Sequence, residues 1–386
     1  MFRPAGDENC SRGFGWIEPL KGNALSESEV HDPPDAAALA ADEIRRIQAD
    51  FGKVLAVSVT SRCNLHCRHC GRSCVAEGVD LPDELIARIG AGLPSVSRGI
   101  REFGITGGEP MLCRDRVRSL SDMAADCGIT ACVMTNAYWA TSVSIAKQVL
   151  RSFAGLRAIG VSTDRYHLPF VPLSHIRNAC EAAREIGFGV RVSITAAVPH
   201  DIEDERLIAD VREFAGDDLL VQELAPRGRA RSLKETPPTS SELPLLPCTS
   251  LGPLIREDGV VAPCCRGLDW LPRGHVMSVG DLREASLPEL YRRLQSHAVL
   301  QFIRVWGFSS LFERMRSAGL AGFFPGGHLQ LSPCATCSAL CRIPELCGFF
   351  ETLMADSWFR IQVASGRHLV LDESEMLDLL LPSSIQ

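Results

Sequence analysis

The sequence predicts an α/β protein: a partial (β/α)6 parallel barrel followed by a smaller, cysteine-rich C-terminal domain. Three observations support this prediction. Apolar, β-branched segments alternate six times with amphipathic segments of helical period, which is typical of parallel strands joined by crossover helices. No decisive Rossmann glycine signature is present. Finally, the polar motifs of this part follow predicted strands, as residues at the C-terminal rim of a barrel do.

The predicted strands are short apolar runs at 54–60, 101–106, 129–135, 156–162, 188–198 and 219–224. Helices are expected at 82–96, 114–127, 141–154, 173–186 and 202–215. Several of these helices open with Pro, Asp, Ser or Thr and are followed by Gly, which is typical of helix caps.

The chain is predicted to have five parts: an N-terminal arm and helix at 1–53, the barrel at 54–228, a linker at 229–247, the cysteine-rich domain at 248–350 and a C-terminal extension at 351–386. Within the arm, residues 35–51 have a helical pattern. The linker is rich in proline, serine and charge. After it we expect a hairpin that turns at Asp258-Gly259, and then helices over 286–319.

Composition narrows the classes of function. The 386 residues are 46% apolar and 23% charged, as in ordinary globular proteins. A net charge of −7 argues against a nucleic-acid partner held by phosphate contacts. The N-terminus lacks a signal-peptide pattern, and no apolar run approaches the length of about 18 residues needed to span a membrane. We therefore expect a cytoplasmic protein that binds neither nucleic acid nor a membrane.

Cysteine usage is the most unusual feature of the sequence. Eleven of the sixteen cysteines form three groups: Cys63, Cys67, Cys70 and Cys74; Cys248, Cys264 and Cys265; Cys334, Cys337, Cys341 and Cys347. In a reducing compartment, clustered cysteines more often bind metal or do redox chemistry than form disulfides. The scattered cysteines are expected to be small buried side chains.

The first group contains a C-x3-C-x2-C motif, Cys63, Cys67 and Cys70, directly after the first predicted strand. Three thiolates on one loop can hold three irons of a [4Fe–4S] cluster and leave the fourth iron open for a ligand. The alternative is a zinc site in which His66 or His69 is the fourth ligand.

The second predicted strand ends in Thr106-Gly107-Gly108-Glu109-Pro110, where glycines permit close backbone approach and one acid can meet an ammonium group. Together with the cysteine motif, this segment resembles the radical S-adenosylmethionine (SAM) superfamily over about residues 54–228. The resemblance implies that Cys63, Cys67 and Cys70 ligate the cluster. It also implies that Gly107, Gly108 and Glu109 bind the methionine end of SAM.

The same resemblance suggests further SAM contacts. Ser162 and Asp164, at the end of the fourth strand, match where the family places polar groups for SAM, although a helix N-cap is an equal alternative. Asn136 matches a TNG segment of related enzymes, with Ala137 in place of the glycine.

The C-terminal cysteines resemble a SPASM-type auxiliary cluster domain. Cys248, Gly259 and Cys264 have the spacing of its opening, while the later spacings are exchanged relative to the family. The resemblance implies one or two auxiliary [4Fe–4S] clusters. The predicted ligands are Cys248, Cys264 and Cys347 for the inner cluster, and Cys334, Cys337 and Cys341 for the outer one. One cluster with spare thiols, a cluster plus zinc, and a zinc ribbon remain alternatives, and Cys265 has no assigned role.

A few other residues are weaker candidates. Cys74 is expected to be a packed thiol, and Cys113 either a buried thiol or a hydrogen donor at the barrel mouth. The remaining candidates are polar residues that follow predicted strands, with roles in proton transfer, in the pocket or in ordinary polar contacts: Tyr166, His167, Gln222 and Glu223.

The resemblance implies a reaction and its partners. A reduced cluster would cleave SAM to a 5′-deoxyadenosyl radical that abstracts hydrogen from a substrate, with flavodoxin or ferredoxin as electron donor. Auxiliary clusters favour an oxidative modification, such as a cross-link, a thioether or a dehydrogenation. The expected substrate is a ribosomally made precursor peptide, with a small molecule such as an aminocyclitol or sugar as the alternative. A non-catalytic iron–sulfur or zinc protein is a remote alternative.

The residues before the first strand lack the pattern of a leader-binding winged-helix module. A peptide substrate is therefore expected to dock directly or to need a separate recognition protein.

Overall fold

The computed structural model describes residues 51–197, 200–225, 227–233, 248, 252–324 and 333–373. The helix expected at 35–51 and most of the expected linker lie outside the described residues.

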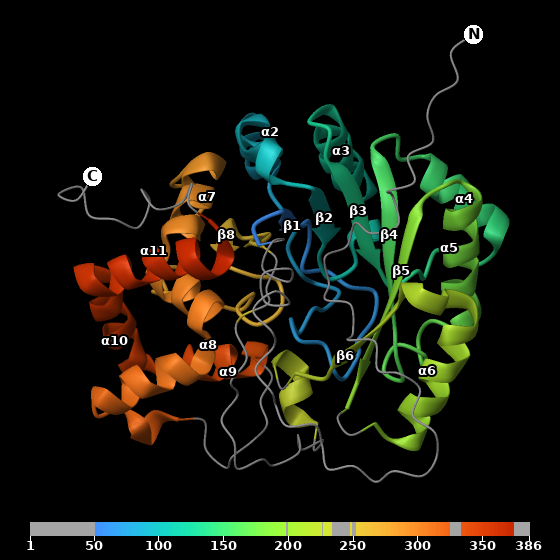
Figure 1. The fold of residues 1–386 in the computed structure, drawn as a ribbon. Helices are drawn as coiled ribbons and strands as arrows, with labels where there is room; N and C mark the ends of the chain where they lie inside the picture. The colour runs from blue at the N-terminus through green and yellow to red at the C-terminus, as the bar shows by residue number, and fades with distance from the viewer. Residues whose placement is uncertain are drawn as a thin grey trace.

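A central sheet organises the described chain, with the strand order β6-β5-β4-β3-β2-β1-β7-β8-β9 (Figure 1). Its first six strands are β1 (Val54–Ser58), β2 (Glu102–Thr106), β3 (Thr130–Thr135), β4 (Leu156–Thr163), β5 (Gly189–Ala196) and β6 (Leu219–Glu223). Each of these six is parallel to its neighbour in this series. Their carboxyl ends therefore meet at one edge of the sheet. The predicted six-stranded parallel arrangement is confirmed.

Five helices connect these strands and lie along the outer side of the sheet (Figure 1). They are α2 (Asp83–Val96), α3 (Arg114–Asp126), α4 (Val143–Arg151), α5 (Leu173–Glu185) and α6 (Ile202–Ala215), close to the predicted ranges. Local capping explains where two of them begin. The side chain of Ser142 accepts a hydrogen bond from the Ile145 amide, and that of Asp201 accepts from two amides of the first turn of α6.

The predicted hairpin extends this same sheet. Strand β7 (Leu254–Ile255) pairs in parallel with β1, and β8 (Val260–Ala262) returns antiparallel to β7 across the turn at Asp258-Gly259. Strand β9 (Gly280–Asp281) then pairs with β8. The hairpin is confirmed, but its attachment to β1 was not predicted, because that pairing joins segments far apart in the sequence.

The C-terminal part is mainly helical and lies on the side of the molecule away from α6 (Figure 1). Its helices are α7 (Leu287–Ser296), α8 (Ala298–Ser317), α9 (Pro333–Leu340), α10 (Pro344–Ala355) and α11 (Ser357–Leu371). Helices α8 to α11 surround a second apolar cluster that includes Phe302, Phe312, Phe350 and Phe359, whereas the buried leucines of α7 join the cluster formed with the sheet. Among the described residues, no helix is both long and apolar enough to cross a membrane.

A buried ion pair ties the hairpin to the loop after β1. Arg72 donates to Glu257 at 2.6 Å and to the Ser58 hydroxyl at 2.7 Å, and Ser58 donates to Glu257 at 2.7 Å. Burial alone would raise the pKa of Glu257, but the charge of Arg72 and the hydrogen bond from Ser58 hold it below its ordinary value. These three groups thus bond to one another across the junction between β1 and the hairpin.

Replacing Glu257 by Gln should lower the free energy of unfolding by about 3 kcal/mol, because Arg72 is left as an uncompensated, largely buried charge. Urea denaturation of the purified chain measures this change. The matched control is Glu84→Gln, which removes an exposed pair with Arg88 and should cost less than about 0.5 kcal/mol. Equal effects of the two substitutions would show that the Arg72–Glu257 pair does not hold the junction.

Candidate active site

A cavity of about 460 Å³ lies at the carboxyl ends of the parallel strands. Its lining brings together most of the residues singled out in the sequence: Cys63, Cys67, Cys70, Gly107, Gly108, Asn136, Ser162 and Asp164. These residues follow four successive strands, so the parallel sheet alone accounts for their meeting. Their individual roles remain predictions, but their convergence on one cavity is an observed feature of the structure.

The cysteine loop, residues 62–78, has little regular secondary structure. Short backbone bonds shape it, including Cys63 N–H to Val75 O at 2.9 Å and Cys70 N–H to Cys67 O at 3.3 Å. Burial raises the pKa of the Cys63 thiol to about 11. A hydrogen bond with Cys74 lowers the pKa of Cys70 and raises that of Cys74. Cys74 is buried, as expected for a packed thiol, and it also lines the cavity.

The end of β2 lies directly against this loop. Gly108 N–H donates to Thr60 O at 2.7 Å, and Glu109 N–H donates to Arg62 O at 2.8 Å. A Cβ atom on Gly108 would lie 2.1 Å from the Arg62 carbonyl oxygen, so only glycine fits. The second glycine of the motif therefore brings β2 and the cysteine loop into backbone contact.

Glu109 does not line the cavity and is fully buried. Its carboxylate accepts hydrogen bonds from the Thr135 hydroxyl at 2.7 Å, the Asn136 amide at 2.8 Å and the Met111 amide at 3.0 Å. Burial raises its pKa to about 7, although these hydrogen bonds oppose the shift. Glu109 thus holds the end of β3 in place, and its predicted contact with the ammonium group of SAM stays a prediction.

Asn136 reaches the cavity from the end of β3. Its side-chain amide donates to Asn64 Oδ1 of the cysteine loop at 3.0 Å. The next residue, Ala137, has a positive φ of 57°, a conformation that glycine adopts without strain. This backbone geometry explains why a glycine is favoured at the matching position of the TNG segment.

Asp164 holds two histidines that line the cavity beside Cys67. Its Oδ2 atom lies 3.2 Å from His69 Nε2 and 2.9 Å from His167 Nδ1, while its Oδ1 accepts from the Tyr166 and His167 amides. Burial would raise the pKa of Asp164, but the two histidines lower it further than burial raises it. The His69 ring stacks on Tyr166 with centroids 4.8 Å apart.

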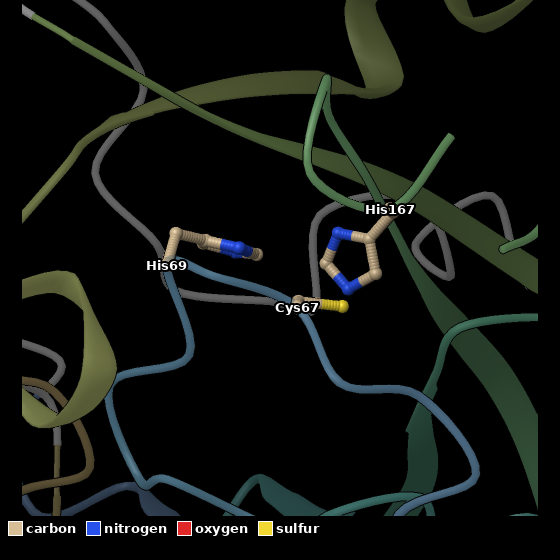
Figure 2. A group of neighbouring side chains, drawn as sticks. All are labelled: Cys67, His69 and His167. Atoms are coloured by element: carbon tan, nitrogen blue, oxygen red, sulfur yellow. The ribbon is translucent and has the colours of Figure 1, made fainter. Parts of the chain in front are cut away.

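Figure 2 shows His69 and His167 on either side of Cys67. The donor atoms of these three side chains all lie within 4.8 Å of one another. This set differs from the zinc site considered in the sequence analysis, because it contains one thiol and two histidines and not three thiols and one histidine. His66, the other histidine considered for that site, is exposed.

The C-terminal cysteines reach the same cavity. Cys265 and Cys334 line it, as do Gln222 and Glu223 from the end of β6. Burial raises the pKa of Cys334 to about 11, and neighbouring thiols, Cys264 among them, add to the shift. Cys264 is thus close to a cysteine that was predicted to serve the other cluster.

The pKa of Cys337 is raised, and the largest cause is a hydrogen bond with Cys341. Cys264 is close enough to Cys337 to add to this shift. Cys347, the predicted partner of Cys264, lies 3.7 Å from His275 Nε2. The backbone amide of Cys248 donates to Ile303 O at 3.2 Å. The predicted division of ligands between two clusters therefore stays a prediction.

Cys113 has the buried position that was one of its two alternatives. Its sulfur contacts Arg62 at 3.3 Å and Asp80 at 3.4 Å, outside the lining of the cavity. The sequence did not indicate five charged residues that line the cavity: Arg72, Arg227, Arg229, Arg266 and Asp269. No local pattern marks these residues, apart from their position beside a cysteine group or a strand end.

Comparison with known proteins identifies one domain of the chain. Residues 57–214 match the family model described as the Radical SAM superfamily. This segment is therefore a radical SAM domain, the domain of a family of iron–sulfur enzymes that use a [4Fe–4S] cluster and SAM.

The chain is also similar to individual proteins, over different parts of its length. A putative peptide biosynthesis protein, YydG of Bacillus subtilis, is 21% identical over 79% of this chain and 97% of its own length. GTP 3′,8-cyclase of Rhodopirellula baltica is 32% identical over 41% of this chain, and the chain spans only 46% of that relative. Among solved structures, Streptococcus suis SuiB bound to SAM has a TM-score of 0.47 at 14% identity, covering 63% of this chain and 66% of SuiB.

The raised pKa of Glu109 predicts a pH dependence of stability. Between its ordinary value of 4.5 and about 7, the folded chain keeps a proton that the unfolded chain releases. Rising pH therefore destabilises the fold through this group, by an amount on the order of 3 kcal/mol across the window. Glu109→Gln removes the contribution, so the stability of wild type relative to the variant should fall from pH 5 to pH 7.

Urea denaturation of both proteins without cluster, at half-unit pH steps, measures this difference. Other titrating groups are common to both chains and cancel. A difference that stays constant with pH would contradict the assignment.

Proposed function

We propose that Cys63, Cys67 and Cys70 hold the [4Fe–4S] cluster of this radical SAM enzyme, and that SAM binds beside it in the 460 Å³ cavity. The observation that carries the proposal is that all three motif cysteines and the ends of β2, β3 and β4 line this one cavity. When bound, the cluster and SAM supply one-electron cleavage of SAM to a radical that abstracts hydrogen from a substrate.

The donor set suits such a cluster. Three thiols come from one loop, which matches three irons and leaves the fourth open for SAM. Gly107, Gly108 and Asn136 line the cavity beside this loop, and Ser162 and Asp164 line it from the end of β4. Glu109 then acts by holding Asn136, and Asp164 by orienting His69 and His167.

We further propose a ribosomally made precursor peptide as the substrate. The similarity to YydG, over most of both chains, supports this choice. The similarity to GTP cyclases is confined to less than half of the chain and gives less support to a nucleotide substrate. A small natural-product intermediate is the second candidate.

The C-terminal cysteines are proposed to bind one or two auxiliary [4Fe–4S] clusters. The presence of Cys265 and Cys334 in the cavity lining supports a cluster near the substrate, where it could accept an electron and make the net reaction oxidative. The same proposal includes a flavodoxin or ferredoxin as reductant, a separate peptide-recognition protein and a cytoplasmic location.

The test compares wild type with a Cys63/Cys67/Cys70→Ala triple variant after anaerobic reconstitution. The variant should lose about four irons per chain, one cubane, and should no longer form 5′-deoxyadenosine from SAM and dithionite. Cys180→Ala is the matched control: it removes a fully buried cysteine of α5 outside the cavity and should keep both properties. Equal iron content in the triple variant, or zinc in place of iron in wild type, would contradict the proposed site.

Iron counts also report on the auxiliary sites. Roughly twelve irons in wild type would indicate two auxiliary clusters, and roughly eight would indicate one. Mass spectrometry of a precursor peptide encoded beside the gene, incubated with the loaded enzyme, separates the peptide from the small-molecule proposal: an unchanged peptide would favour the latter.

A further inference from the structure

One arginine makes an unusual set of contacts with the cysteine loop. Arg229 donates its backbone N–H to Cys70 O at 3.0 Å, its Nε–H to Cys67 O at 2.9 Å and a terminal N–H to Cys74 O at 2.7 Å. A single residue thus binds the carbonyl oxygens of three of the four cysteines in this loop. It comes from the short 310 helix Gly228–Ser232 after β6, at the start of the segment that the sequence analysis expected to be a linker.

The preceding residue lets this helix approach so closely. Gly228 has a φ of +54°, and a Cβ atom there would lie 2.4 Å from Cys70 O and 2.5 Å from Gly71 O. The conformation and the space both require glycine. The two backbones are therefore in direct contact, which places the Arg229 side chain along the loop.

The same turn also contacts the C-terminal part of the chain. Arg227 forms an ion pair with Asp269, whose side chain is 2% exposed. On its other side Arg227 packs against the cysteine loop, since a Cβ atom on Gly71 would lie 2.7 Å from Arg227 Nε. Arg229 is thus anchored on a turn that is itself held between two regions.

The position of Arg229 has two physical consequences. Its three hydrogen bonds restrain a loop with little secondary structure, so the entropy of ordering that loop is lost before any metal arrives. Its guanidinium, which is always charged, lines the cavity beside Cys70. A positive charge near an iron–sulfur cluster favours the reduced form, because reduction adds negative charge.

We propose that Arg229 is a positioning residue for the initiating cluster: it holds the cysteine loop in its cluster-binding shape and its charge favours the reduced cluster. The inference rests on the proposed cluster at Cys63, Cys67 and Cys70. It assigns to a residue outside the cysteine motif part of the control over loading and potential.

The experiment uses full-length Arg229→Gln and Arg229→Lys, reconstituted anaerobically beside wild type. Arg231→Gln is the matched control, since Arg231 is an exposed arginine of the same short helix. Cluster loss in the presence of a ferrous chelator is followed by absorbance. Electron paramagnetic resonance follows reduction, and the change of the signal on adding SAM identifies the cluster with an open iron.

In Arg229→Gln, the cluster that responds to SAM should be lost about tenfold faster than in wild type. Its ratio of reduced to oxidised form at a fixed potential should fall about tenfold, which is 59 mV for a one-electron couple. Arg229→Lys keeps the positive charge but cannot bond to both Cys67 O and Cys74 O as the guanidinium does. This variant should therefore lose the cluster faster, while the potential of its cluster stays near that of wild type. Arg231→Gln should match wild type in both measurements.

Wild-type rates and potential in both Arg229 variants would overturn the inference. If Arg229→Gln fails to fold by circular dichroism, Arg229→Lys decides alone: faster cluster loss supports the inference, and wild-type retention overturns it. The absence of any cluster that responds to SAM in wild type would instead contradict the proposed function.

Discussion

The site depends on backbone contact between a loop of little secondary structure and its neighbours at the carboxyl edge of the sheet. A loop whose three thiols are proposed to bind a metal cluster cannot be held by that cluster before it arrives. Here Gly108 and Glu109 bond to the start of the loop, and Arg229 bonds to its later carbonyls. The parallel sheet matters for function because it delivers these partners, from β2 and β6, to one place.

Polar residues around this loop form hydrogen bonds and ion pairs with one another. The Glu109 carboxylate accepts hydrogen bonds from Thr135, Asn136 and Met111. The Asp164 carboxylate contacts two histidines. Both acids thereby hold neighbouring side chains and backbone amides in fixed positions. This arrangement separates the residues that form the surface of the cavity from those that keep that surface in shape.

Much of the fold and part of the site could be predicted from the sequence, because both are encoded locally. Six strands and five helices follow from short patterns, and the two motifs follow from residue spacing at strand ends. The pairing of β1 with β7, the ion pair of Arg72 with Glu257 and the bonds of Arg229 could not be predicted, because each joins segments distant in sequence without a local pattern. Glu109 shows a further limit: its type and position were recognised, but its full burial depends on β3 and its surroundings.

The attachment of β7 to β1 has a mechanical consequence. Two regions joined only by a flexible segment can move apart like the halves of a hinge, whereas strands of one sheet cannot separate without breaking their ladder. Because β7 and β8 continue the sheet of the barrel and lead directly to Cys264 and Cys265, the spacing between the two cysteine regions is set when the chain folds. The width of the gap that an electron would cross between metal groups held there thus depends on the pairing of β1 with β7.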